Sequence, residues 1–242
     1  MQIRQYLALL KKRVSAKTVY EAQLALRKFF RFLVDEGEIA GSPCDGIKLT
    51  RYRVDPQPLY SLDEIKALLA SCDLKTPSGI RDYAIFMVLF DTGVRVGELI
   101  SMSPPDWKNR LVKVDGKTGV RYVPLGLSSL QALERYIRKW SIPDIPLWRG
   151  KYGPLTTSGV LQMARRRCSQ LRLPCKGVHA FRRSAAAQMK RMGMNDSDIM
   201  EIMGWEEVTM LRRYVASVSL ELAQSAHRQF SPVDSAMAFN IR

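Results

Sequence analysis

Five residues in the middle and near the end of the chain are of the types that phosphoryl transfer requires: Arg95, Lys117, His179, Arg182 and Tyr214. A phosphoryl group in transfer spreads negative charge over its non-bridging oxygens, so positioned cationic donors supply most of the catalysis. Arginine binds two phosphate oxygens with its planar fork, whereas lysine can also give a proton to a leaving oxygen. Tyrosine can form a covalent intermediate. The set therefore predicts cutting and rejoining of a phosphodiester.

The sequence around these residues falls into four blocks. They are Asp91-Thr92-Gly93-Val94-Arg95-Val96-Gly97-Glu98-Leu99, Val114-Asp115-Gly116-Lys117 with Arg121-Tyr122-Val123-Pro124-Leu125, His179-Ala180-Phe181-Arg182-Arg183-Ser184, and Met203-Gly204-Trp205 with Tyr214. In order and spacing they resemble the blocks of the phage-integrase-type tyrosine recombinases. The resemblance spans roughly residues 10 to 216, and four blocks in sequence arise by chance far less often than one short motif.

The resemblance implies a reaction. Tyr214 would attack the scissile phosphate, leaving a 3′-phosphotyrosine and a free 5′-hydroxyl. Arg95 and Arg182 would hold the non-bridging oxygens, and Lys117 would protonate the leaving 5′-oxygen. Lys113 is the neighbouring alternative to Lys117 in the same segment. In the family this reaction uses neither ATP nor a divalent metal, so no cofactor is expected.

Four further residues of the blocks are expected to support the pocket. His179 and Trp205 would complete it, and the Trp205 indole N–H can donate one hydrogen bond but cannot take a proton. Glu98, the family's acidic residue, would orient a basic catalytic residue. Arg183 stands where the family often has histidine and is expected to add a phosphate contact. Structural alternatives remain: Trp205 as a core anchor, and Glu98 in an ordinary intrahelical ion pair.

The net charge indicates the class of partner. The 242 residues include 38 Lys and Arg against 23 Asp and Glu, a net charge of +15. This excess favours a polyanion, with nucleic acid as the leading candidate. The sequence has no run of about 18 apolar residues and no visible signal peptide, so we expect no membrane span and a cytoplasmic location. The residues predicted to contact DNA are Lys48, Arg51, Arg53, Arg165, Arg166 and Arg183.

The resemblance also implies an assembly, in which four protomers act on two DNA sites. The expected partners are double-stranded DNA with paired half-sites and a homo-tetramer on that DNA. The tail from about residue 216 resembles the segment that docks on a neighbouring protomer, with an intramolecular cap as the alternative. Two other functions stay open: a type IB topoisomerase, which uses a nearly identical pocket as a monomer, and a DNA-binding regulator without catalysis.

The cysteines argue against a metal centre. Cys44, Cys72, Cys168 and Cys175 form no C-x-x-C pair, and Cys168, Cys175 and His179 match no common zinc spacing. Reduced, mostly buried thiols are the better interpretation.

The pattern of the chain predicts a mainly α fold with a small β-sheet. Residues 1–49 are expected to form a helical DNA-binding domain. The family's first domain, which clamps DNA, usually has at least four helices, so residues 1–49 are expected to be a shortened form of it. Residues 50–60 are expected to be a basic linker, followed by a catalytic domain over 61–242. In that domain Ser61 and Glu64 have the spacing of a capping box, and residues 111–125 indicate a hairpin. Further helices are expected at about 79–91, 128–140, 157–171, 180–192 and 196–203.

Overall fold

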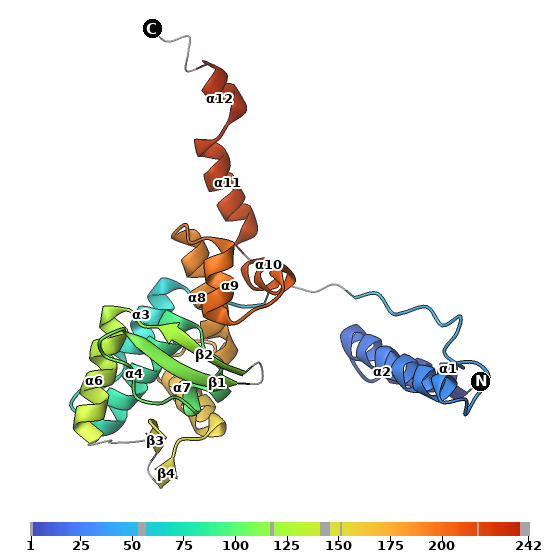
Figure 1. Cartoon of the computed structure of the whole chain (residues 1–242), viewed down its shortest axis with the longest axis horizontal. Helices are drawn as coiled ribbons and strands as arrows, with labels where there is room; N and C mark the ends of the chain where they lie inside the picture. Colours follow the sequence, from blue (N-terminus) through green and yellow to red (C-terminus); the bar gives the residue numbers. More distant parts are fainter. Residues whose placement is uncertain are drawn as a thin grey trace. The chain divides into compact units, whose positions relative to one another are not determined.

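A computed structural model describes residues 2–52, 57–116, 119–140, 146–150, 152–216 and 218–237. Two of the predicted functional residues, Arg53 and Lys117, lie outside the described residues. The chain divides into two compact units, Met1–Asp55 and Pro56–Arg242, and each is described by itself (Figure 1).

The first unit consists of α1 (Gln2–Lys11), α2 (Ala16–Asp35) and the chain that follows them. Ser15 caps α2 by accepting a hydrogen bond from the Thr18 amide at 3.2 Å. After α2 the backbone returns along it, because the buried Gln23 side chain donates to the Lys48 carbonyl at 3.2 Å and accepts from the Thr50 amide at 2.7 Å. These bonds hold the segment that carries the predicted DNA contacts Lys48 and Arg51, whose side chains are exposed.

The second unit is mainly helical, as predicted (Figure 1). Its elements are α3 (Leu62–Ala70), α4 (Pro77–Thr92), α5 (Val96–Ile100), β1 (Leu111–Gly116), β2 (Gly119–Pro124), α6 (Leu127–Trp140), β3 (Arg149–Gly150), β4 (Gly153–Pro154), α7 (Thr157–Gln170), α8 (Val178–Arg191), α9 (Asp196–Met203), α10 (Val208–Val215), α11 (Ser219–Gln229) and α12 (Pro232–Met237). The capping box of Ser61 with Glu64 and the predicted hairpin are both present. A helix after Gly93, implied by the expected intrahelical position of Glu98, is present as α5, whereas the sequence pattern did not indicate β3 or β4, and the last helix range it gave ended at residue 203.

Helix α4 is the centre of this unit and packs against α3, α6 and α8. It is apolar on most of its surface because neighbours cover it on several sides, with Ile85 and Phe86 almost fully buried. The Phe86 ring stacks on Phe181 of α8, with 5.3 Å between the ring centroids. The core therefore fixes the middle of α4 relative to α8.

The hairpin of β1 and β2 buries one face and exposes the other, as its period of two requires. Val112, Val114 and Val123 are buried, whereas Tyr122 is exposed. The antiparallel register pairs Gly116 with Gly119 at the hairpin's end. Strand β1 packs against α5. The hairpin therefore ends beside the helix that follows Arg95.

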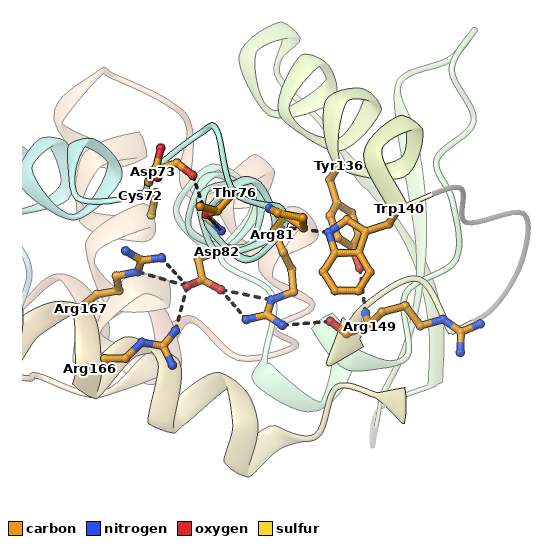
Figure 2. A network of polar contacts seen from close by, with 12 residues as sticks. Cys72, Asp73, Thr76, Arg81, Asp82, Tyr136, Trp140, Arg149, Arg166 and Arg167 are labelled. Atoms are coloured by element: carbon orange, nitrogen blue, oxygen red, sulfur yellow. Dashed lines mark hydrogen bonds and ion pairs between the residues drawn. The ribbon is translucent and has the colours of Figure 1, made fainter. Parts of the chain in front are cut away.

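Three arginines surround the buried carboxylate of Asp82 on α4. Figure 2 shows the guanidinium groups of Arg81, Arg166 and Arg167 turned toward Asp82. The contacts are 2.7 Å from Arg81 Nη2, 2.8 Å from Arg167 Nη2 and 3.1 Å from Arg166 Nη2. Arg167 also donates to the Ser71 carbonyl at 2.7 Å, so this cluster joins α7 to α4 and to the end of α3. None of the described helices is long and apolar enough to cross a membrane.

Replacement of Asp82 with asparagine should lower the free energy of unfolding by about 3–5 kcal/mol, because it removes the counter-charge of buried arginines. Urea unfolding measures this change. The matched control is Arg166→Gln, which removes a side chain that is 53% exposed and should cost less than about 1 kcal/mol. Equal effects of the two substitutions would contradict a central role for Asp82.

Candidate active site

Arg182 lies in the second turn of α8 and is 1% exposed. Its Nη1 donates to the Gly93 carbonyl at 2.7 Å and its Nη2 donates to the Met203 carbonyl at 2.6 Å. Burial, followed by repulsion from Arg95, lowers the pKa of Arg182 to about 10. The side chain therefore stays cationic at neutral pH while it joins the ends of α4 and α9.

Glycine is required at both of those helix ends. Gly93 caps α4 with φ of 62° and Gly204 caps α9 with φ of 61°, in the left-handed region that residues with a Cβ avoid. A Cβ at Gly93 would lie 2.5 Å from the Met203 Cε, so the Met203 side chain would have to move, and the positive φ adds backbone strain. The close approach lets the single guanidinium of Arg182 reach both carbonyls.

Arg95 follows the first of these caps and begins α5. Its Nη1 donates to Glu98 Oε1 at 2.7 Å, and its backbone amide donates to Glu98 Oε2 at 2.7 Å. Arg121 of β2 donates to both oxygens of the same carboxylate, at 2.5 Å and 3.0 Å. Burial by itself raises the pKa of Glu98, but the hydrogen bonds from Arg121 and Arg95 outweigh it and lower this pKa to about 2.

Trp205 and Tyr214 lie next to Arg182. The Arg182 guanidinium lies over the Trp205 ring at 5.1 Å from its centroid, and the ring centroids of Trp205 and Tyr214 are 4.6 Å apart. Trp205 is 6% exposed and belongs to the core cluster around α9 and α10, so it is a core residue as well as a pocket residue. Tyr214 on α10 is half-buried.

His179 lies in the first turn of α8 and is exposed. Partial burial lowers its pKa, and the positive charges of Arg183, Arg182 and Arg95 lower it further. The imidazole is therefore favoured in its neutral form, in which one ring nitrogen donates and the other accepts a hydrogen bond. Arg183 instead turns to the chain before α3, where it donates to the Pro58 carbonyl at 3.1 Å and 3.2 Å.

The structure brings together Arg95, His179, Arg182, Trp205 and Tyr214 from four helices or their ends. Lys117 follows Gly116 in the chain, and a Cβ at Gly116 would lie 2.8 Å from Glu98 Oε1. The hairpin's first strand therefore ends against Glu98, although Lys117 itself is outside the described residues. Lys113, the alternative to Lys117, is paired with Tyr122 within the hairpin and not at its end.

The predicted DNA contacts on α7 are not part of this cluster. Arg165 is exposed, and Arg166 donates to Asp82 at 3.1 Å. Arg166 therefore has a structural partner that a run of three arginines did not reveal. Sequence reasoning also missed Arg121, although it lies in one of the four blocks; its position on the strand after the predicted hairpin turn was the available signal.

The thiols are not arranged as a metal centre. Cys44, Cys72 and Cys168 are buried and Cys175 is exposed. Within the described part of the chain, no group of three or more His, Cys, Asp and Glu side chains could hold a metal ion.

Chemically, the cluster places an excess of positive charge beside a phenol. Arg95, Arg121 and Arg182 carry three positive charges against the single charge of Glu98, and Tyr214 lies near enough to Arg182 to interact with its charge. Such a cluster would stabilise negative charge that develops on a phosphoryl group next to Tyr214.

Known proteins share this sequence pattern and fold. A model described as the phage integrase family matches residues 60–220. The tyrosine recombinase XerD of Listeria monocytogenes serotype 4b (strain F2365) is 27% identical over 232 residues, which cover 90% of this chain and 77% of that protein. The tyrosine recombinase XerC of Anoxybacillus flavithermus (strain DSM 21510 / WK1) is 29% identical over 214 residues, with 83% of this chain and 71% of that protein covered.

Two solved structures of recombinases bound to DNA have the same fold. The Tn1549 transposon integrase in complex with transposon right end DNA matches with a TM-score of 0.76 at 20% identity, over 93% of this chain and 82% of that one. The XerH site-specific recombinase, bound to its palindromic difH substrate in a post-cleavage complex, matches with a TM-score of 0.77 at 17% identity, over 93% of this chain and 71% of that one.

The Glu98 cluster should make stability depend on pH. Since the folded-state pKa of about 2 lies below the ordinary value of 4.5, ionised Glu98 stabilises the fold above pH 4.5 and this contribution is lost as the pH falls toward 2. The loss should amount to about 3 kcal/mol. The measurement is the free energy of unfolding of the wild type minus that of Glu98→Gln across this range. If the unfolding free energies of the wild type and of Glu98→Gln changed in parallel with pH, the strong ion pairing of Glu98 would be contradicted.

Proposed function

The chain belongs to the phage integrase family and is a tyrosine-type DNA recombinase, and from this premise we propose that it cuts and rejoins DNA through a 3′-phosphotyrosine on Tyr214. Tyr214 would attack the scissile phosphate and release a 5′-hydroxyl. The ester formed stores the energy of the broken bond, so rejoining by a 5′-hydroxyl requires neither ATP nor a cofactor.

The observation that carries the proposal is a pair of buried donors beside Tyr214. Arg182 Nε and Trp205 Nε1 are buried and have no hydrogen-bond partner among the described residues. Buried N–H groups nearly always have a hydrogen-bond partner. Arg121 Nε and Trp148 Nε1 also have none among the described residues, so what favours an acceptor at Arg182 and Trp205 is their position beside Tyr214. A phosphate oxygen is such an acceptor, and the excess of positive charge favours an anion over a neutral group.

The other pocket residues have complementary roles in this proposal. Arg95 uses one side-chain donor on Glu98 and keeps the rest of its fork for a non-bridging oxygen. Neutral His179 would donate to or accept from the reacting oxygens. Lys117 would protonate the leaving 5′-oxygen, because a lysine carries charge and can also release a proton. Lys48, Arg51, Arg53, Arg165, Arg166 and Arg183 would contact the DNA backbone.

We also propose action on paired half-sites by a homo-tetramer. The tail helices α11 and α12 expose apolar side chains, with Leu220 at 73%, Phe230 at 77% and Val233 at 64%. Exposed apolar side chains grouped on a short segment are typical of a protein-binding surface, which supports docking of the tail on a neighbouring protomer.

Tyr214→Phe should leave DNA affinity unchanged and abolish the covalent adduct, because phenylalanine keeps the packing on Trp205 but lacks the nucleophilic oxygen. The probe is a nicked duplex that the protein itself selects from a randomised pool, and the readout is protein covalently bound to DNA on a denaturing gel. Tyr122→Phe, on an exposed strand position, is the matched control and should form the adduct normally. An adduct that persists in Tyr214→Phe would assign the nucleophile elsewhere.

Lys117→Ala should slow formation of the adduct by about 10² to 10⁴, as expected on loss of a positioned proton donor. A duplex with sulfur at the 5′-bridging position should restore the rate, because a thiolate leaves without protonation. Lys113→Ala is the control and should show neither the defect nor the rescue. If sulfur rescues Lys113→Ala instead, Lys113 is the proton donor.

A further inference from the structure

We propose that Arg121 is a positioning residue of the phosphate site, which shares the charge of Glu98 and thereby leaves the other guanidinium donors of Arg95 available to bind phosphate. This inference rests on the proposed function. It gives a role to a side chain on β2 that touches neither Tyr214 nor Trp205 through any hydrogen bond in the described structure.

The two arginines share the Glu98 carboxylate unequally. Arg121 binds it with two guanidinium nitrogens, at 2.5 Å and 3.0 Å, in the bidentate geometry that suits arginine best. Arg95 gives it one guanidinium nitrogen and its backbone amide, both at 2.7 Å. Each carboxylate oxygen therefore accepts two hydrogen bonds, which saturates Glu98. Within the described part of the chain, most side-chain donors of Arg95 have no partner.

Removal of Arg121 would change this division. Glu98 is 1% exposed, so its charge is weakly screened and needs a cation. With Arg95 as the remaining partner, the carboxylate would attract the fork of Arg95 and neutralise its charge. The pocket would then lose both positive charge and phosphate donors, although every residue assigned to phosphate binding would still be present.

Arg121 also lies against the bend that leads to Trp205. A Cβ at Gly204 would lie 3.1 Å from Arg121 Cδ and Nε, so the arginine stem fills the space beneath this left-handed glycine. The side chain is 15% exposed, and its Nε is buried. One residue of β2 thus contacts both the acid that orients Arg95 and the helix end before Trp205.

A double-mutant cycle tests the proposed charge role. Arg121→Met keeps much of the stem but removes the charge, so it should lower the rate of adduct formation at saturating DNA by about 100-fold, as for loss of a transition-state donor. DNA affinity should change by less than about tenfold. Addition of Glu98→Gln should restore the rate at least about tenfold, because Arg95 is no longer held by an unshared carboxylate. The probe is the same nicked duplex, and rates are divided by the folded fraction from circular dichroism.

The Asp82 cluster supplies a matched control. Arg167 is 10% exposed and binds a fully buried carboxylate, as Arg121 does. Arg167→Met should lower the melting temperature but leave the rate of adduct formation per folded molecule unchanged. Addition of Asp82→Asn to Arg167→Met should not raise that rate. Arg121→Lys retains the charge and is a milder change. Its rate of adduct formation should fall between the rates of the wild type and Arg121→Met.

Two results would overturn the inference. One is a normal rate in Arg121→Met, and the other is a defect that Glu98→Gln leaves unchanged or worsens, which would show a purely structural role. Both results count against the inference only if the wild type forms the adduct. If the wild type forms none on the selected duplex, the proposed function is contradicted, and the inference with it.

Discussion

Arg182 is a charged side chain in the interior whose hydrogen bonds go to the carbonyls of Gly93 and Met203 rather than to a carboxylate. These carbonyls are at the ends of α4 and α9, where the helix dipoles place partial negative charge. That charge is enough to hold the guanidinium but too small to neutralise it. The positive potential therefore remains available beside Trp205 and Tyr214, while the same bonds fix α4, α8 and α9 relative to one another.

Two clusters in this chain each place arginines around one buried carboxylate. They differ in how many arginine donors remain without a partner among the described residues. Asp82 receives two hydrogen bonds from each of Arg81 and Arg167, and these arginines spend a further nitrogen on a carbonyl. Glu98 is saturated as well, but most of the donors of Arg95 stay unspent, and the Arg95 side chain is 30% exposed. The first cluster holds helices together, whereas the second also presents charge to whatever enters the pocket.

The sequence predicted the residues whose types the chemistry restricts. Roles for Tyr214 and Arg182 could be predicted because few side chains can attack a phosphate or bind its oxygens, and the blocks around them supplied the spacing. These roles stay predictions. Arg121 and Arg166 could not be assigned, since their partners lie 23 and 84 positions away in the chain and only folding brings them close. Two short elements were missed for a related reason: β3 and β4 have two residues each, too few for a periodic pattern.

The first two turns of α8 serve the pocket and the chain before α3 at once. Consecutive residues of a helix point in different directions, so Arg182 faces the pocket while Arg183 and Ser184 reach other partners. Ser184 accepts from the Tyr60 amide at 2.8 Å and Arg183 holds the Pro58 carbonyl. Residues 58–60 are also bound by Lys176, which donates to the Leu59 carbonyl at 2.8 Å and to the Tyr60 hydroxyl at 3.0 Å. The chain before α3 is therefore attached both to the turn of α8 that carries Arg182, which also binds the ends of α4 and α9, and to the segment that leads into α8.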